Sequence, residues 1–333
     1  MPRSRPIRLL ILSRSASIYS THRLVEAARE RKVSVRVINP VECEMHLDGS
    51  KPYLYHRRKP IPPADAVIPR IAQSITPYGL AVVSQLALGG MVLVNSASAI
   101  SSSRNKMRSL QLLTGNGVGV PPTLMARDPR SIKEMIPLVG GVPVLIKLLQ
   151  GGDRQGVMVC ETMPSLEAAL EAILGLGQNL LVQPYVQKAG DRDLRVLVVG
   201  GKVQCAVQRI PRKGRLVRTL GRGARLEPVQ LPAALERTAI RAAGILGLEV
   251  AAVDMLEHEG EARVFEVHSS PGLRHLEAAS GIDLAGAIVD HAIRLVRLAR
   301  AERGSPAPLP QPPPVEAPRT RARRPRPKGG ESR

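Results

Sequence analysis

The sequence contains 333 residues, of which 44% are hydrophobic, and carries a formal net charge of +20. A chain of this length can bury several cores, so we expect about two or three domains. No apolar run approaches the ~20 residues that cross a bilayer, and the N-terminal stretch MPRSRPIRLLILS has neither a long apolar core nor a cleavage site. These features predict a cytoplasmic protein without a membrane partner. The scattered Cys43, Cys160 and Cys205 lack C-x-x-C spacing, which argues against a zinc cluster or a disulfide framework.

Part of the positive charge lies at the C-terminus. Residues 303–333 hold eight basic and two acidic residues and nine prolines, with too few apolar side chains to form a core. We therefore predict a disordered basic tail that is rich in Pro and Arg. Its role stays open between a solubilising extension and a contact with RNA or the ribosome. The chain offers only five Tyr and one Phe for base stacking, which argues against a dedicated single-strand binder.

The first hundred residues alternate between apolar strands and helices. Such alternation is typical of a parallel sheet covered by helices on both faces, so we predict an α/β domain over residues 1–100. Strands are expected at 7–12, 33–39, 64–71 and 91–95, and helices from Thr21 to Arg31 and from about Pro77 to Leu88.

Antiparallel strands and helices follow, which indicates α+β structure. We assign residues 101–190 to a second domain and 191–302 to a third. The second is expected to contain a helix from Ser101 to about Thr114, two strands over 142–161, a helix from Ser165 to Leu174 capped by Ser165, and a strand over 179–186. The third is expected to contain a hairpin over 193–210 that turns at Gly200-Gly201, a basic loop over 211–225, a helix over about 232–246, two strands, and a helix from about Asp283 to Arg300.

The two strands of the third domain carry acidic side chains that indicate a metal site. In VFEVHSSPGL, Glu266 and His268 are two residues apart and point to one side, while Phe265 and Val267 point to the other. An isolated E-x-H is more often an ordinary solvated strand. Asp254, however, lies in an apolar run, where a carboxylate needs a charged partner or a cation. We predict that the two strands are neighbours and that Asp254, Glu266 and His268 hold one cation.

A lysine at the mouth of a glycine-bearing turn suits a phosphate group. Lys147 ends an apolar strand just before Gly151 and Gly152, and Gly156 closes the same loop. Backbone N–H groups can approach phosphate oxygens there, and the ammonium group neutralises their charge. Similar turns occur in ordinary hairpins, so this motif alone does not decide the function.

The tripeptide Gln183-Pro184-Tyr185 follows an apolar strand. Its backbone can offer an adenine ring an N–H and a C=O, although proline also ends ordinary strands.

Taken in order, these motifs resemble the ATP-grasp superfamily and, within it, the RimK-like carboxylate–amine ligases. The resemblance covers about residues 7–300 and includes LILSRSASIYSTHRLVEAA, AVIPRI, RNKMRSLQLL, QPYV, LRVLVVG and EVHSSPGL. It implies an ATP-grasp fold in which a Rossmann-like N-terminal α/β domain precedes two α+β subdomains that hold the nucleotide between two sheets. It also implies that ATP and Mg²⁺ or Mn²⁺ are bound.

The resemblance assigns roles to individual residues. Phosphate contacts would come from Lys106, Lys147, Gly151, Gly152 and Gly156, and from Arg218 and Thr219 in the loop VRTLGRGA. Gln183, Pro184 and Tyr185 would form the adenine hinge, and Asp193 would approach the ribose. Asp254, Glu266 and His268 would hold the metal, and Arg195 and Arg222 would serve the reacting carboxylate or phosphate.

Several positions depart from the family's pattern. His268 stands where the family has Asn, and imidazole favours Mn²⁺ over Mg²⁺ or indicates a damaged metal position. Arg154 replaces a glycine of the phosphate loop, where it either blocks the backbone or binds phosphate itself. Gln150 replaces Glu, and Thr219 and Gly221 replace Asn and His.

The resemblance predicts an ATP- and metal-dependent carboxylate–amine ligase. The γ-phosphoryl group of ATP would move to a substrate carboxylate, and an amine would then attack the acyl phosphate. Glutamate or another amino acid would be joined to a carboxylate of a peptide, a protein or a small molecule. The departures keep a second hypothesis open, namely a catalytically impaired relative that binds nucleotide or a partner without ligation. Relatives of this kind tend to assemble, so we expect a homo-oligomer.

Overall fold

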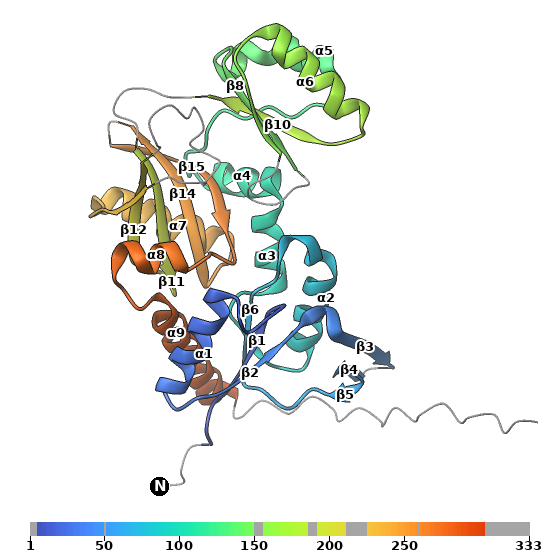
Figure 1. Ribbon diagram of the computed structural model, residues 1–333, viewed down its shortest axis with the longest axis vertical. Coiled ribbons are helices and arrows are strands. Elements are labelled where there is room, and N and C mark those ends of the chain that lie inside the picture. Colours follow the sequence, from blue (N-terminus) through green and yellow to red (C-terminus); the bar gives the residue numbers. More distant parts are fainter. Residues whose placement is uncertain are drawn as a thin grey trace, which may run out of the picture.

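The computed structural model describes residues 5–49, 51–149, 156–185, 192–210, 225–258 and 260–303. The tail beyond Arg303 lies outside these ranges. The described chain forms four sheets, arranged along an elongated molecule (Figure 1). The predicted site residues that also lie outside the described ranges are Gly151, Gly152, Arg218, Thr219 and Arg222, together with the departures Gln150, Arg154 and Gly221.

A parallel sheet of order β2-β1-β6-β7 forms the N-terminal part, as predicted. Alternate residues of its strands pack on opposite faces: Leu9 and Ile11 contribute to the core with α1, and Leu10 and Leu12 to the core with α2. The elements are β1 (Arg8–Leu12), α1 (Tyr19–Glu30), β2 (Ser34–Ile38), β6 (Ala66–Pro69), the 3-10 helix η2 (Gln73–Ile75), α2 (Thr76–Leu88) and β7 (Val92–Leu93).

A small antiparallel sheet between β2 and β6 was not predicted. It follows the 3-10 helix η1 (Pro40–Glu42) and consists of β3 (Cys43–Asp48), β4 (Lys51–His56) and β5 (Lys59–Pro60). Its apolar residues alternate with charged ones over only a few positions, so the period of two is a weak signal. The sheet packs near α2, where Gln85 Nε2 donates to Tyr53 O at 3.0 Å.

The helix predicted from Ser101 to Thr114 is two helices, α3 (Ala97–Arg104) and α4 (Lys106–Gly115). They meet at Asn105, whose extended backbone interrupts the helix and whose side chain accepts a hydrogen bond from Arg108 N at 3.0 Å. Asparagine favours such a cap over a helix interior because its side chain satisfies an unpaired N–H group. Lys106 is therefore the first residue of α4.

A three-stranded antiparallel sheet, β10-β8-β9, lies at the end of the molecule opposite the N-terminal sheet (Figure 1). Ser165 was predicted to cap the helix on this sheet, but Thr162 is the cap residue, and Ser165 completes a capping box with it. The elements are α5 (Pro129–Met135), the 3-10 helix η3 (Ile136–Val139), β8 (Val144–Leu148), β9 (Val157–Cys160), α6 (Met163–Gly175) and β10 (Leu180–Pro184).

The five-stranded antiparallel sheet β13-β12-β11-β14-β15 holds the predicted metal residues Asp254, Glu266 and His268, together with Asp193 and Arg195. One of its faces packs on α7, and the other packs on α8 and α9. The elements are β11 (Arg192–Val199), β12 (Lys202–Ile210), β13 (Arg225–Pro228), α7 (Ala233–Ile245), β14 (Val250–His258), β15 (Glu261–His268), α8 (Arg274–Ser280) and α9 (Leu284–Arg303).

The C-terminal helix α9 joins the two large sheets into one core. Its buried residues Ile288, Val289 and Ala292 share a cluster with Leu9 of β1 and Val250 of β14. In Figure 1, α9 lies beside α1. Domain boundaries at residues 100, 190 and 302 stay predictions.

Two polar contacts reinforce this connection between the N-terminal and C-terminal parts. Arg31, which directly follows α1, donates two hydrogen bonds, of 2.6 and 2.8 Å, to the carboxylate of Asp290 in α9. Buried Asn95 donates to Val250 O at 2.8 Å and to Ser269 O at 2.9 Å, and accepts from Val250 N at 2.9 Å. The end of the parallel sheet is thereby tied to the segment that directly follows His268.

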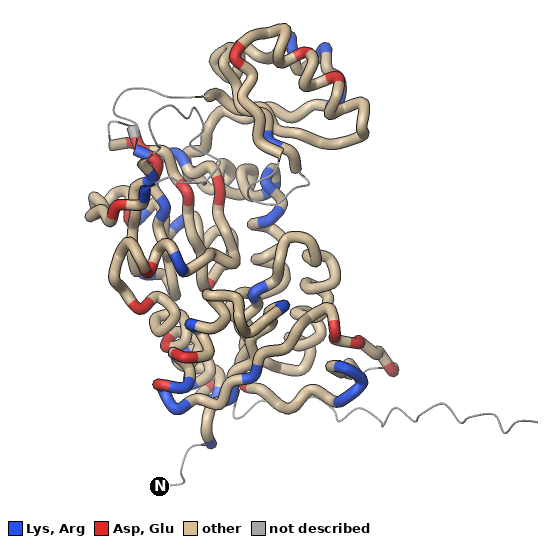
Figure 2. The backbone as a smooth tube through the Cα atoms, viewed as in Figure 1, with Lys and Arg blue, Asp and Glu red and all other residues tan. Residues whose placement is uncertain are grey.

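Charge is spread through the described chain. Figure 2 shows both basic and acidic residues in each of its parts. Among the described residues, no helix is both long and apolar enough to cross a membrane.

Candidate active site

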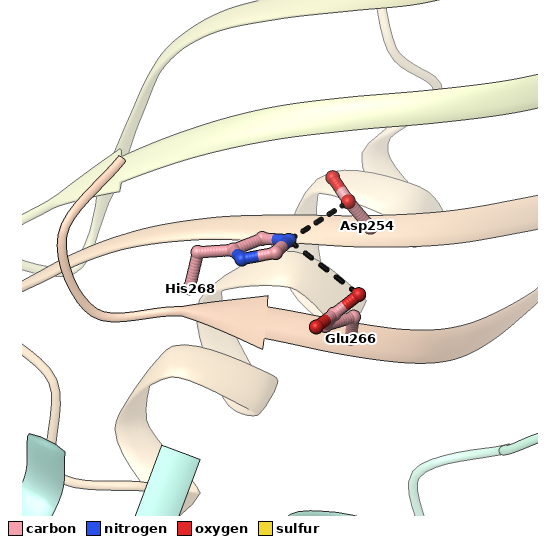
Figure 3. A group of neighbouring side chains, drawn as sticks. All are labelled: Asp254, Glu266 and His268. Atoms are coloured by element: carbon pink, nitrogen blue, oxygen red, sulfur yellow. Dashed lines mark hydrogen bonds and ion pairs between the residues drawn. The ribbon is translucent and has the colours of Figure 1, made fainter. Parts of the chain in front are cut away.

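Asp254, Glu266 and His268 point toward one another from two adjacent strands (Figure 3). Asp254 of β14 stands opposite Glu266 of β15, and His268 Nε2 lies 3.0 Å from Asp254 Oδ2 and 3.8 Å from Glu266 Oε2. One donor atom from each residue lies within 4.8 Å of the others. The predicted pairing of the strands is therefore confirmed, and the donors are close enough to share a cation. Metal binding by them stays a prediction.

A β-bulge interrupts the pairing next to this group. The partner on β15 changes from Glu266, opposite Asp254, to Val264, opposite Met255. Phe265 is the extra residue, and a bulge of this kind breaks the strict alternation of side chains.

Phe265 consequently faces the same side as Glu266, and the prediction that it faces away is wrong. The centroid of its ring lies 5.2 Å from Lys147 Nζ and 5.8 Å from Arg209 Cζ, both within the range of a cation–π contact. Val267 is buried in the core under the sheet, as predicted. The only Phe of the chain therefore belongs to the cationic side of the site.

Two arginines hold the buried carboxylate of Asp254. Arg195 of β11 donates to Oδ1 at 2.7 Å and to Oδ2 at 2.6 Å, and Arg209 of β12 donates to Oδ2 at 3.1 Å. Burial on its own would raise the pKa of Asp254, but the two guanidinium groups hold that pKa well below its usual range. Arg195 and Arg209 therefore supply the charged partner that a carboxylate in this apolar run needs.

The donor set also fits a divalent cation. A carboxylate offers about four lone-pair positions, and the guanidinium N–H groups occupy three of those of Asp254. Glu266 is more open, since its side chain is 25% exposed and its ion pairs with described residues are those with Lys106 Nζ at 3.1 Å and His268 Nε2 at 3.8 Å. A metal held here would therefore be bound chiefly by Glu266, with Asp254 and His268 completing the set.

Arg209 is a site residue that the sequence analysis missed. Its Nε and Nη2 donate to Asp193 Oδ1 at 3.0 and 2.6 Å, so one guanidinium bridges Asp193 and Asp254. A plain hairpin turning at Gly200-Gly201 would place Gln208 opposite Asp193. A register shift between Leu197 and Val198 moves the pairing by one residue, so that Leu194 pairs with Gln208 and Arg209 comes beside Asp193.

Lys147 and Lys106 approach the acidic cluster from two different elements. Lys147 comes from β8 and is buried, with 6% of its surface exposed, whereas Lys106 comes from the first turn of α4. Burial lowers the pKa of Lys147 to about 8, with Glu266 opposing and Lys106 adding to the effect. The two lysines that were predicted to bind phosphate therefore both lie near Glu266.

The predicted adenine hinge lies at the end of β10. Gln183 and Pro184 are its last residues, and Gln183 Nε2 donates to Thr123 Oγ1 at 2.8 Å. Tyr185 donates its backbone N–H to Pro143 O at 3.0 Å. Because proline has no N–H group and that of Tyr185 is engaged, these two residues do not supply the free backbone N–H expected for an adenine hinge, and adenine binding here stays a prediction.

Gly156, at the end of the predicted phosphate loop, has a backbone conformation that requires glycine. Its φ of +85° is in the left-handed region, and a Cβ atom there would lie 2.8 Å from side-chain atoms of Leu148. Gly156 O also accepts a hydrogen bond of 2.7 Å from Leu148 N.

A cavity of about 250 Å³ opens beside the acidic cluster. It lies between the end of the parallel sheet, helices α3 and α4, and the end of β15. Its lining consists of residues 71–73, Ser103, Arg104, Lys106 and residues 266–270.

Comparison with known proteins gives two family matches and many relatives. Residues 7–100 match the RimK PreATP-grasp domain and residues 103–292 the RimK-like ATP-grasp domain. The chain is 45% identical over 283 residues to the "Probable alpha-L-glutamate ligase" of Thioalkalivibrio sulfidiphilus, covering 85% of this chain and 94% of that protein. It is 46% identical over 284 residues to the protein of the same name from Teredinibacter turnerae, again covering 85% of this chain and 94% of that protein.

Solved structures share the fold at lower identity. The ATP-grasp ligase PsnB in complex with its minimal precursor superimposes with a TM-score of 0.68 at 22% identity, covering 87% of this chain and 98% of PsnB. The RimK domain protein ATP-grasp from Sphaerobacter thermophilus superimposes with a TM-score of 0.66 at 23% identity, covering 86% of this chain and 99% of that protein. The predicted ATP-grasp fold is therefore confirmed, and so is the prediction of a ligase that forms C–N bonds. The chain belongs to the RimK-like ATP-grasp family.

Proposed function

We propose that this protein is a ligase dependent on ATP and a divalent metal, Mg²⁺ or Mn²⁺, that joins an amino acid, with L-glutamate as the first candidate, through its amine to a substrate carboxylate. The convergence of Lys147, Lys106, Glu266 and Asp254 beside one cavity carries this proposal. The names of the relatives that are 45–46% identical support glutamate. Because those relatives are called ligases, ligation is favoured over binding without turnover.

The acceptor is a carboxylate on a peptide, a protein or a small molecule. A peptide is the first candidate, because PsnB has been solved with the precursor peptide PsnA2. Assembly into a homo-oligomer and a contact of residues 303–333 with RNA remain further proposals that rest on the sequence alone.

The chemistry needs charge compensation and alignment more than acid–base groups. The carboxylate oxygen attacks the γ-phosphorus of ATP and releases ADP, and the amine then attacks the acyl carbon and releases phosphate, so that one C–N bond forms. Lys147 and Lys106 neutralise phosphate charge, while Arg195 and Arg209 keep Asp254 ionised. A bound divalent cation would supply further neutralisation of the phosphates.

His268 makes the choice of metal a testable part of the proposal. Imidazole is a poorer ligand for Mg²⁺ than the amide oxygen of Asn and a better one for Mn²⁺. We expect wild-type protein to turn over faster with Mn²⁺, and His268→Asn to shift the preference toward Mg²⁺.

The test follows ADP release by purified protein with ATP, either metal, and a panel of amino acids and acidic peptides. Glu266→Gln should lower turnover by about 100-fold or more, because it removes the most open carboxylate of the metal set. Glu261→Gln is the matched control, since this exposed residue lies at the other end of β15. Absence of ADP release across the panel, with nucleotide still stabilising the protein, would favour the binding-only alternative.

A further inference from the structure

Lys147 is a buried cation, with only 6% of its surface exposed. Among the described residues, no carboxylate forms an ion pair with its Nζ, and Glu266 and Asp254 attract the ammonium group from a longer distance. A buried charge without a close partner is unfavourable. The position of this ammonium group therefore depends on its other contacts.

Phe265 supplies such a contact. The centroid of its ring lies 5.2 Å from Lys147 Nζ, and cation–π attraction is stronger for a desolvated cation than for an exposed one. Arg209 Cζ lies 5.8 Å from the same centroid, but its guanidinium is already paired with Asp193 and Asp254. Lys147 is thus the cation that depends on the ring.

The backbone of β15 directs Phe265 toward these cations. The bulge leaves Phe265 without an opposite residue on β14, whereas a regular strand would direct it to the same face as Val267, which is buried in a core. Among the described residues, Phe265 belongs to none of the hydrophobic clusters. A large apolar side chain that a bulge aims at charged groups is more typical of a site residue than of a packing residue.

The contact also connects two sheets. Lys147 comes from β8 of the three-stranded sheet, and Phe265 comes from β15 of the five-stranded sheet. An ammonium group has three N–H donors, and a ring covers only one side of it, so donors remain available to phosphate oxygens. An ammonium group that is fixed before the ligand arrives loses less entropy on binding.

We propose that Phe265 is a positioning residue, whose ring holds the ammonium group of Lys147 beside the five-stranded sheet so that a polyphosphate chain meets a cation already in place. This inference deepens the proposed function and rests on it, because the polyphosphate is that of ATP. Since the ring acts through Lys147, binding of a phosphate chain without a base should depend on the ring. Binding of a base without phosphates should not.

The chain contains a single Phe, so the charge distribution of this ring can be changed without changing any other residue. Protein is made with phenylalanine replaced by a form that carries one or three fluorine atoms on the ring. Fluorine changes the shape of the ring little, but it withdraws electron density from the ring face and so weakens the attraction for a cation. Calorimetry in the presence of Mg²⁺ then compares tripolyphosphate, which has no base, with adenosine, which has no phosphate.

Tripolyphosphate should bind about threefold more weakly, or weaker still, to the trifluorinated protein, with the monofluorinated protein between it and wild type. The affinity for adenosine and the unfolding temperature should stay the same. Constant affinity for tripolyphosphate would overturn the proposal. Tighter binding would also overturn it, because the ring would then compete with phosphate for the ammonium group, and so would an equal loss of adenosine affinity.

Lys147→Met tests whether the ring acts through the lysine. In this variant, fluorination should no longer change the affinity for tripolyphosphate, and a persisting loss would assign the effect to Arg209 and overturn the proposal. A second readout needs no ligand. The single fluorine NMR resonance of the monofluorinated protein should move in Lys147→Met but not in Lys133→Met, the control, whose lysine pairs with Glu167. A resonance that stays in place in Lys147→Met would contradict the contact.

The positioning role and the ligase function can fail separately. If fluorination weakens tripolyphosphate binding but no ADP is released with any substrate, the role of Phe265 stands and the ligase function fails. If ADP is released but fluorination changes no phosphate affinity, the ligase function stands and the role of Phe265 fails. A wild-type protein that binds neither ATP nor tripolyphosphate would overturn both.

Discussion

Lys147 is the residue whose protonation is most directly tied to the proposed phosphate site. Burial keeps its pKa at about 8 in the protein without ligand. A phosphate group next to the ammonium favours the charged form, so nucleotide binding should raise this pKa. The lysine therefore couples nucleotide binding to the uptake of a proton.

We predict that ADP binding at pH 8 takes up about half a proton per site, because about half of the Lys147 side chains are neutral before binding and nearly all are charged after it. Calorimetric titrations in two buffers of different ionisation enthalpy measure this number. Lys147→Arg should abolish the uptake, since arginine stays protonated throughout. Equal apparent enthalpies in the two buffers for wild type would contradict the prediction.

The lowered pKa of Lys147 also determines how the free energy of unfolding changes with pH. Between pH about 8 and the ordinary lysine value of 10.5, the unfolded chain binds more protons at this residue than the folded chain does. The contribution of Lys147 to the free energy of unfolding therefore rises with pH across this window.

At the level of single residues, the sequence located the acidic group but not its complete surroundings. The spacing of Glu266 and His268 and the apolar context of Asp254 were sufficient to place three side chains together. Phe265 was misplaced because a bulge leaves no mark in a pattern of alternating residues. Arg209 was missed because the shift that brings it beside Asp193, between Leu197 and Val198, is likewise invisible in the sequence.

At the level of elements, the break at Asn105 decides where Lys106 lies. In one continuous helix Lys106 would be an interior residue, whereas in the structure it opens α4 and reaches Glu266. The asparagine side chain holds the first turn by accepting from Arg108 N.

We expect Asn105→Ala to lower the free energy of unfolding by about 1 kcal/mol, the usual effect of losing a helix cap. It should also weaken ADP binding several-fold, because Lys106 then belongs to a frayed turn. Thr162→Ala removes the equivalent cap of α6 and is the control, since α6 contributes no residue to the acidic cluster or its cavity. Equal losses of ADP affinity in both variants would show that the cap acts through general stability alone.

The sequence predicted the elements with strong periodicity and missed those without it. The parallel sheet and the hairpin over 193–210 follow from long apolar runs between clear turns. The β3–β4–β5 sheet consists of short strands with charged residues, and its hydrophobic pattern is no stronger than that of a loop. The break between α3 and α4 depends on one cap inside a stretch whose composition suits a helix throughout.

On the scale of the whole molecule, the last described element is α9, which ends at Arg303. The residues after it were predicted from composition alone to remain unpacked. They carry seven basic and two acidic residues.

We predict that deletion of residues 304–333 changes the unfolding temperature by less than about 2 °C and leaves ADP affinity unchanged, because the segment has no apolar pattern with which to dock. Differential scanning calorimetry and ADP titration of the two chain lengths measure both quantities. A loss of several degrees would mean that the segment packs on the folded part. Titration of both proteins with an RNA oligonucleotide at two salt concentrations tests the proposed RNA contact.

The position of α9 has a consequence for how the protein is made. The face of the N-terminal sheet that carries Leu9 and Ile11 is covered in part by Ile288 and Val289, so it cannot be completed until the last helix has been synthesised. At about 5–20 residues per second, the ribosome takes roughly 10–40 s to travel from the end of β7 to α9. During that interval the nascent chain exposes an unfinished apolar surface on this sheet, to which chaperones can bind during translation.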